Sequence, residues 1–184
     1  MTGSSDAFAW LFDLHRDRVY RHALRVLGSV HDAEDVTAGA FFELWRRREA
    51  VTVVEGSVLP WLLVTTSNLS RNAARSLRRY RSLLKSLPRS GPSRGAGEVA
   101  QDRLEASAGA RQVRDALRAL SPTDAALIAM TAFEGFSPSE VATALGISDG
   151  AARTRLHRAR ARVGSALERS GAEMLPSGTE EGAR

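Results

Sequence analysis

The sequence has no cysteine, a single lysine and few residues that favour β-structure. Without cysteine, the chain has no disulfide, no thiol switch and no cysteine-based zinc site. Its 4 histidines are scattered, so we expect neither a metal nor a cofactor. No apolar run approaches the ~20 residues of a membrane span, and the N-terminus lacks the order of a signal peptide. We therefore expect a cytoplasmic protein that does not contact a membrane.

The sequence also lacks the arrangements typical of an enzyme. Enzymes that act on nucleic acids need an activated nucleophile, a metal cluster or a glycine-rich loop that binds phosphates. None of these is found. The glycines within residues 88–97 follow no predicted strand and precede no Gly-Lys-Ser or Gly-Lys-Thr pattern. We expect a protein that binds its target and does not act as an enzyme.

Charge is gathered in blocks along the chain. The protein has a net charge of +5, and 25 of its 26 basic residues are arginine. Residues 49–94 carry a net +6 and residues 148–169 a net +4, whereas residues 95–147 between them carry a net −3. Two basic modules separated by acidic sequence indicate a protein that binds a nucleic acid at two places. Arginine suits this task because its forked donors match phosphates and guanine edges.

Apolar residues recur at helical spacing along most of the chain, which predicts an all-α fold. The only β-branched run, residues 51–54, is short. We expect a first helix that is capped by Ser5 and ends at Gly28. A second helix begins with capping-box spacing at Ser29 and runs to about Arg48. Its expected buried stripe comprises Val36, Ala40, Leu44 and Trp45.

A third helix is predicted with Pro60 in its first turn, and it reaches at least Tyr80. One face carries Trp61, Asn68, Asn72, Arg75 and Arg79, with Arg71 and Arg78 beside it. Amides can hydrogen-bond base edges, arginines hold phosphates, and an indole can stack on an exposed base. This mixture favours a strand that is being separated over an intact duplex. A tryptophan at a helix end is, however, about as often a simple core anchor.

A flexible linker divides the chain. Residues 88–97, PRSGPSRGAG, are rich in proline, glycine and serine, and we place the linker at residues 87–101. The N-terminal helical bundle then comprises residues 5–86. The C-terminal module comprises residues 102–170 and begins with a helix that ends near Leu120. Residues 171–184 are small, polar and acidic, as is typical of a disordered tail.

The C-terminal module contains a predicted helix-turn-helix. Ser137 begins the first helix with a capping box, Gly146 makes the turn, and Ser148 caps the second helix. In this motif the N-terminal part of the second helix enters the major groove of a duplex. The residues expected to contact DNA are Ser148, Ala151, Arg153, Thr154, Arg155 and Arg158. The alternative is a solvated basic helix in an ordinary bundle, although solvated faces normally mix charges of both signs.

The outer face of the second helix differs from these basic surfaces. It carries Asp32, Asp35, Glu43 and Arg46. Its carboxylates would repel DNA. The face is therefore either plain solvated surface or a docking site for a protein.

These segments, in this order, resemble a bacterial extracytoplasmic-function (ECF) sigma factor of the sigma-70 family. Residues 32–47, DAEDVTAGAFFELWRR, are similar to the conserved region that docks on the clamp helices of RNA polymerase. Residues 60–81 resemble the part that captures and melts the minus-ten element. Residues 133–163 resemble the fourth region, which reads the minus-thirty-five element. The chain has Ala38 and Gly39 where family members often have Gln and Glu, so we expect a differently shaped docking face.

The resemblance implies a specificity subunit that binds the clamp helices and the flap of core RNA polymerase and directs initiation at promoter DNA. It assigns polymerase binding to the outer face of the second helix. It also implies an anti-sigma factor as a partner, and that partner must sense any redox signal because this chain has no thiol. The alternative is a stand-alone helix-turn-helix transcriptional regulator. That alternative explains residues 133–163 but gives no role to residues 32–47.

Overall fold

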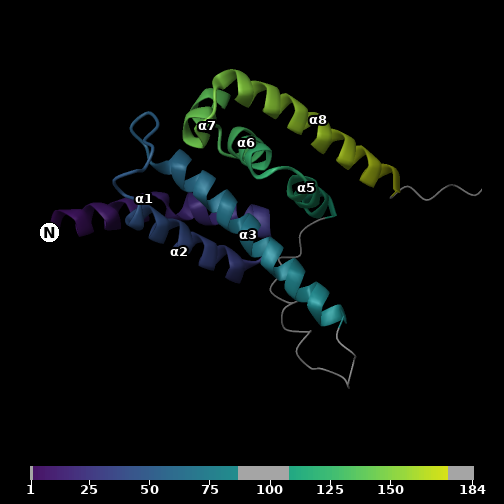
Figure 1. Cartoon of the computed structure of the whole chain (residues 1–184), viewed down its shortest axis with the longest axis horizontal. Helices are drawn as coiled ribbons and strands as arrows, with labels where there is room; N and C mark the ends of the chain where they lie inside the picture. Colours follow the sequence, from purple (N-terminus) through teal and green to yellow (C-terminus); the bar gives the residue numbers. More distant parts are fainter. Residues whose placement is uncertain (1, 87–107, 174–184) are drawn as a thin grey trace, which may run out of the picture.

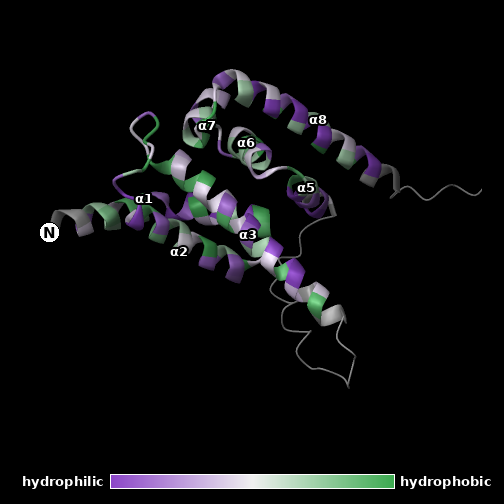
Figure 2. Ribbon diagram, in the orientation of Figure 1, coloured by the Kyte–Doolittle hydropathy of each residue, from purple (hydrophilic) through white to green (hydrophobic). Residues whose placement is uncertain are grey.

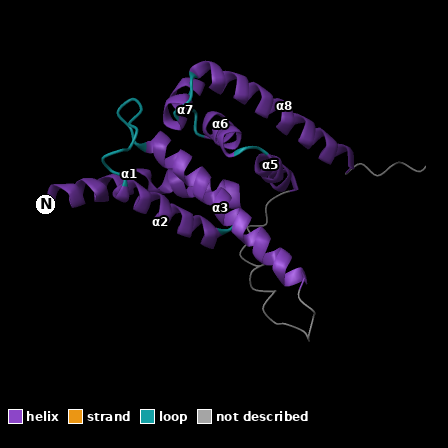
Figure 3. Ribbon diagram, viewed as in Figure 1, coloured by secondary structure: helices purple, strands orange, loops and turns teal. Residues whose placement is uncertain are grey.

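The computed structural model describes residues 2–86 and 108–173, and their fold is all-α, as predicted (Figures 1 and 3). The helices are α1 (Thr2–Leu27), α2 (Val30–Arg46), α3 (Leu59–Ser86), α5 (Ala108–Ala119), α6 (Pro122–Phe133), α7 (Pro138–Leu145) and α8 (Asp149–Glu173). The described residues form no strand, and the connection between α2 and α3 holds only an isolated bridge from Val54 to Ser57. None of these helices is long and apolar enough to cross a membrane.

Local capping signals set several helix ends as predicted. The Ser29 hydroxyl accepts a hydrogen bond from the backbone N–H of Asp32 at 3.2 Å, which fixes the start of α2. Gly28, between α1 and α2, has a φ of +70°, a left-handed conformation that glycine adopts without a steric penalty. Pro60 lies in the first turn of α3, where a helix needs no backbone donor.

One predicted helix boundary is wrong. Ser5 is not the N-cap of α1, because α1 already begins at Thr2 and Ser5 lies within it. No proline interrupts this first turn, so the helix continues through it. The second helix ends at Arg46 with Arg47 as its C-cap, close to the predicted end at about Arg48.

Part of the predicted organisation lies outside the described residues. This applies to the expected linker, residues 87–101, and to residues 102–107, where the first C-terminal helix was expected to begin. The last helix, α8, continues to Glu173 and so includes the first three residues of the expected tail. Residues 174–184 are outside the described part.

The buried face of α2 differs from the prediction at one position. Val36, Ala40 and Leu44 are buried, as predicted. Trp45, however, is 39% exposed, and Phe41 takes its place in the core at 2% exposed. Phe41 packs against Phe12 with ring centroids 4.7 Å apart, whereas Trp45 packs on Phe8 at the edge of the bundle, 5.2 Å away. The stripe therefore turns toward α1 near the end of α2.

Two groups of helices pack against each other. Helices α1, α2 and α3 form an N-terminal bundle, and α5 to α8 form a second group on one side of it (Figure 1). Contacts between the groups run from α3 to α6 and α7, and from α1 to α5. One continuous core includes Val19, Leu62 and Leu63 from the first group and Leu127, Met130 and Val141 from the second. Burial of each such side chain contributes about 1.5–3 kcal/mol to stability. Because the two groups share this core, the described residues form one compact arrangement.

Candidate nucleic-acid and polymerase interfaces

The helix-turn-helix has the geometry that its sequence predicts. A reciprocal capping box begins α7: the Glu140 backbone N–H donates to the Ser137 hydroxyl at 3.2 Å, and the Ser137 N–H donates to the Glu140 carboxylate at 2.7 Å. Hydrogen bonding from Ser137 to the Glu140 carboxylate, first from its side chain and then from its backbone N–H, holds the pKa of Glu140 below its ordinary value. Gly146 makes the turn with a φ of +66°. The Ser148 hydroxyl accepts from the Ala151 N–H at 3.3 Å and begins α8.

Helix α8 has a small apolar side and a large basic side. Ala152, Leu156 and Ala159 are buried in the core, and hydrophilic residues run along the length of the helix (Figure 2). Of the residues expected to contact DNA, Ser148, Arg153, Thr154, Arg155 and Arg158 are exposed and Ala151 is half-buried. Arg155 lies 3.3 Å from the buried carboxylate of Asp124 on α6, and Thr154 donates to the Gly150 carbonyl at 2.9 Å.

The polar face of α3 is only partly open. The exposed members of the predicted minus-ten set are Asn68, Asn72, Arg75, Arg78 and Arg79. Arg71 is half-buried. Trp61 is half-buried and packs against the main core, which favours its alternative interpretation as a core anchor. The two basic surfaces do not come together, because α6 and α7 lie between α3 and α8 (Figure 1).

A buried ion-pair cluster, which the sequence analysis did not identify, joins the two groups of helices. Its centre is Glu134, at the C-terminal end of α6, whose side chain is 6% exposed. The Glu134 Oε1 atom lies 2.8 Å from Nη1 of Arg25, and Oε2 lies 3.4 Å from Nε of Arg18. Arg18 also donates from Nη2 to the Glu134 backbone carbonyl at 3.0 Å. We call Glu134, Arg18, His22 and Arg25 the Glu134 cluster.

His22 is the fully buried member of the cluster. Its Nε2 atom lies 2.8 Å from the Ser67 hydroxyl, which itself donates to the Leu63 carbonyl at 2.8 Å. The Ser67 oxygen therefore accepts from His22, which places a proton on Nε2. The other ring nitrogen, Nδ1, lies 3.6 Å from Oε1 of Glu134. Burial alone would raise the pKa of Glu134, but its interactions with the neighbouring His22 and Arg25 outweigh this effect and lower the pKa to about 2.

Aromatic rings flank this cluster. The Arg25 guanidinium lies 4.7 Å from the centre of the Phe133 ring, and the Arg18 guanidinium lies 5.6 Å from that of Phe136. Arg18, His22 and Arg25 recur at helical spacing, which marks a common face of α1. Nothing in the sequence indicates that Glu134 lies opposite this face, because 109 positions separate it from Arg25.

The predicted polymerase-binding residues are spread along α2. Asp32 is half-buried and Asp35 is exposed, 3.8 Å from His31. Glu43 pairs with Arg46 at 2.7 Å and with Arg47 at 2.8 Å. The hydrogen bond from Arg46 is the main reason that the pKa of Glu43 lies below its ordinary value.

The sequence analysis did not include two aromatic residues on the outer side of α2. Phe42 is 63% exposed and Trp45 is 39% exposed. Exposed aromatic side chains are enriched at protein interfaces, and Ala38 lies one turn before Phe42 on the same face. Gly39 does not belong to this face: a Cβ atom there would lie 3.4 Å from Leu69 of α3. The absence of a side chain at Gly39 therefore affects packing inside the bundle.

The described residues gather no group of three or more histidine, aspartate or glutamate side chains that could hold a metal ion. The described structure combines two basic helix faces, one of them on a helix-turn-helix, with a pair of exposed aromatic side chains on α2.

Comparison with known proteins agrees with this combination. The family Sigma-70 region 2 matches residues 11–80, and the family Sigma-70, region 4 matches residues 110–163. The first match covers α2 and most of α1 and α3, and the second covers the helix-turn-helix. A stand-alone helix-turn-helix regulator does not account for the match to region 2.

Individual relatives and solved structures extend this result. The ECF RNA polymerase sigma factor SigL of Mycobacterium tuberculosis is 30% identical over 149 residues, which cover 81% of this chain and 82% of SigL. The RNA polymerase sigma factor CarQ of Myxococcus xanthus is 31% identical, with 85% of this chain and 86% of CarQ covered. The structure of CnrH in complex with the cytosolic domain of CnrY has a TM-score of 0.58, 24% identity and 91% coverage of both chains. The sigma factor RpoE from Bartonella quintana, in complex with the anti-sigma factor NepR, has a TM-score of 0.56 and 21% identity, with 88% and 97% covered. The chain belongs to the sigma-70 family of RNA polymerase sigma factors and, within it, to the extracytoplasmic-function group.

Proposed function

We propose that this sigma factor recognises its promoter through α3 and α8 and docks on core RNA polymerase through α2. The observation that carries the proposal is the exposure of two basic helix faces on separate modules. The α3 face also offers amide groups, whereas the α8 face is part of a helix-turn-helix. This difference supports different targets for the two modules.

Helix α8 is proposed to read the minus-thirty-five element as duplex DNA. Arg153 and Arg158 are exposed and lie within the first turns, where this motif reaches base edges and phosphates. Arg155 reaches DNA only by exchanging its contact with Asp124, 3.3 Å away, for a contact with the promoter. The later arginines, Arg160 and Arg162, then lie toward the phosphates.

Helix α3 is proposed to hold a strand of the minus-ten element once it is unpaired. Asn68 and Asn72 are exposed one turn apart, and Arg75 follows on the same face. Amides suit the Watson–Crick edges of unpaired bases, and guanidinium groups suit the backbone. Strand separation is proposed to draw on the energy of polymerase binding rather than on catalysis by this chain.

Helix α2 is proposed to contact the clamp helices of the polymerase. The exposed rings of Phe42 and Trp45 supply the apolar area, and the neighbouring pair of Glu43 and Arg46 supplies polar contacts at the rim.

Docking must also move the second group of helices away from α3, because Arg71 is half-buried in the compact arrangement. The flap is the proposed contact of the C-terminal module.

An anti-sigma factor is the proposed regulatory partner. One solved structure with the same fold is a complex of this kind, that of RpoE with the anti-sigma factor NepR. A second, CnrH, was solved in complex with the cytosolic domain of CnrY. We also propose that the protein acts in the cytoplasm, where core polymerase and the genome are found.

The α3 assignment is tested by open-complex formation with core polymerase and a promoter duplex. Asn68→Ala and Arg75→Ala are each expected to reduce strand opening about tenfold, which corresponds to one lost charged or base-edge contact of about 1–3 kcal/mol. Arg21→Ala is the matched control, because Arg21 is an exposed arginine on α1 outside both basic faces. Unchanged opening and an unchanged minus-ten preference in both α3 variants would remove this assignment.

A further inference from the structure

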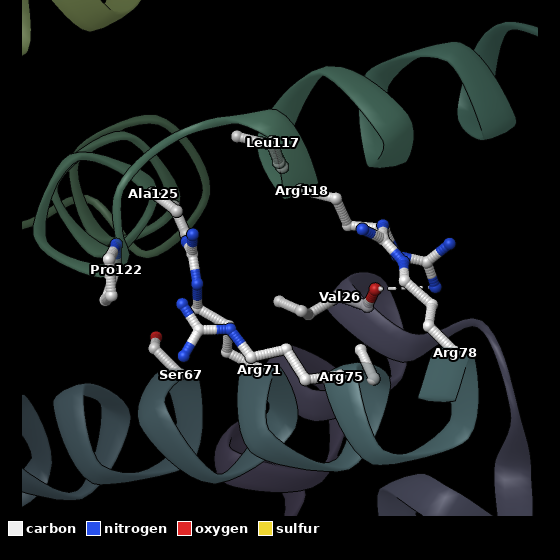
Figure 4. Close-up of a pocket in the computed structure, with 11 residues that line it drawn as sticks. Val26, Ser67, Arg71, Arg75, Arg78, Leu117, Arg118, Pro122 and Ala125 are labelled. Carbon is white, nitrogen blue, oxygen red and sulfur yellow. Dashed lines mark hydrogen bonds between the residues drawn. The ribbon is translucent and has the colours of Figure 1, made fainter. Parts of the chain in front are cut away.

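A cavity of about 100 Å³ lies between α3 and the pair α5 and α6, next to the end of α1 (Figure 4). Its apolar lining comprises Val26, Ala74, Leu117, Pro122, Ala125 and Ala129. An engineered protein cavity of about 150 Å³ binds benzene. The present cavity has about two thirds of that volume, so its apolar part accepts at most one small ring and is too small for an oligonucleotide strand.

Four arginines surround this apolar space. Arg71 and Arg75 lie at the end near Ala125, and Arg78 points toward Arg118 at the other end (Figure 4). Among the described residues, no carboxylate or carbonyl accepts a hydrogen bond from the three α3 arginines. Arg118, on α5, donates to the Leu27 carbonyl at 3.0 Å and so caps the C-terminal end of α1.

The positive charge is poorly compensated. Among the described residues, the carboxylate that pairs with one of these four arginines is that of Asp115, 3.3 Å from Arg118. Its side chain is 73% exposed, so water screens its charge. The buried Nε atoms of Arg114 and Arg118 have no hydrogen-bond acceptor. Burial, followed by the charges of Arg75 and Arg78, lowers the pKa of Arg71. Like charges held this close to apolar walls favour the binding of an anion.

We propose that this cavity binds a small organic oxyanion, namely a phosphate or carboxylate group on an apolar body of about one ring. The apolar body would fill the space between Ala74 and Ala125. The anionic group would bridge guanidinium groups from α3 and α5, which bind phosphates and carboxylates through paired donors. The lining explains both requirements: an inorganic ion leaves the apolar walls empty, and a neutral ring leaves the arginines uncompensated.

Because the walls belong to both groups of helices, the ligand stabilises the compact arrangement. It binds only when α5 and α6 lie against α3, and linkage then shifts the population toward that state. It also occupies Arg71, Arg75 and Arg78. The ligand should therefore compete with minus-ten DNA for these arginines. This competition rests on the proposed function, whereas the binding itself does not.

The site is tested by titration calorimetry on the full chain, without polymerase or DNA. The probes are phenyl phosphate and benzoate, compared with inorganic phosphate and phenol. At least one of the first two is expected to bind about tenfold or more tightly than either fragment, since it alone uses both the walls and the arginines. The comparison of phenyl phosphate with benzoate identifies the preferred anionic group.

Variants connect that binding to the cavity. Ala125→Leu fills the cavity and is expected to weaken binding at least about tenfold, as is Arg78→Gln. Arg111→Gln is the matched control, because Arg111 is exposed on α5 and does not line the cavity. If Ala125→Leu does not fold, Ala74→Leu fills the same space from α3. Equal affinity for phenyl phosphate and inorganic phosphate, or unchanged binding by a folded cavity-filling variant, would overturn the site. Either result leaves the proposed promoter contacts untouched, because the assay contains no promoter.

Discussion

Glu134 is the residue that most directly relates the two groups of helices. Its carboxylate is nearly buried, yet it contacts Arg18 and Arg25 and faces His22, all on one side of α1. Removing a charge from water costs several kcal/mol, so a buried ion pair contributes little net stability compared with apolar packing. Its larger effect is on orientation. A different placement of α6 on α1 would leave the carboxylate buried without its partners, and the cluster thus selects one arrangement of the modules.

Replacement of this carboxylate has a pH-dependent effect. The pKa of Glu134 is lowered from 4.5 to about 2 in the folded protein, so its stabilising contribution is present above about pH 4.5 and is lost as the pH falls toward 2. We expect Glu134→Gln to lower the free energy of unfolding by about 2 kcal/mol at neutral pH. This loss is smaller than the ~3–5 kcal/mol expected when one partner of a fully buried ion pair is removed. The reason is that the Arg18 and Arg25 side chains are 40% and 35% exposed.

Urea denaturation at neutral pH and at about pH 3 measures this effect. The difference between the wild-type protein and Glu134→Gln is expected to shrink at the lower pH. Glu49→Gln serves as control, because Glu49 is exposed and follows α2. An equal difference at both pH values would show that the Glu134 carboxylate is not held ionised by the cluster.

These residues also mark the reach of sequence analysis. Ser29, Ser137 and Gly146 could be assigned in advance, because capping and left-handed turns depend on neighbours within a few positions. Glu134 and the half-burial of Arg71 could not, because both depend on contacts between helices that are distant in the sequence. The exposure of Trp45 was missed for a related reason: helical spacing places it near Phe41, and only the packing of α1 decides which ring is buried.

At the scale of elements, α7 is a short helix that depends on its ends. It has 8 residues, too few to be stable on its own, and both ends are closed by local signals: the capping box at Ser137 and the left-handed turn at Gly146. It buries Val141 and Ala142 against α8 and the core. The caps therefore set the angle at which α8 leaves the turn, and with it the direction of the DNA-reading face.

The contribution of this cap is measurable. Ser137→Ala removes the acceptor for the Glu140 N–H and is expected to lower the free energy of unfolding by about 1 kcal/mol. Ser165→Ala is the control, since Ser165 is exposed in the body of α8 and such substitutions change stability by less than about 0.5 kcal/mol. Thermal unfolding compares the two. Equal midpoints would mean that the capping box does not stabilise α7.

The proposed DNA contacts of the N-terminal turns of α8 are tested by measuring promoter recognition. Arg153→Ala is expected to weaken promoter binding of the polymerase complex and to relax preference at one position of the minus-thirty-five element, at a cost of about 1–3 kcal/mol. Arg169→Ala, an exposed arginine near the other end of α8, is expected to leave the preference unchanged. Selection of binding sites from randomised minus-thirty-five sequences measures both variants. The same base preference in Arg153→Ala and wild type would assign Arg153 to the backbone.

At the scale of the whole molecule, the compact arrangement and the proposed activity require different states. A continuous core holds α6 and α7 against α3, and the Glu134 cluster ties the end of α6 to α1. In the proposed function, promoter binding by both modules requires α3 to be fully uncovered, and the proposed docking of α2 on polymerase supplies the energy for this step. The ligand cavity exists only in the compact state, so occupation of the cavity and opening oppose each other.

Run-off transcription with purified core polymerase and mapped start sites tests the central claim most directly. The account predicts that the chain converts core polymerase into an enzyme that starts at defined positions, each preceded by shared minus-thirty-five and minus-ten sequences. Phe42→Ala is expected to reduce this activity at least about tenfold by weakening polymerase docking through loss of a buried aromatic contact. Stable folding of the chain together with failure to bind core polymerase and to direct initiation from any template would contradict the account.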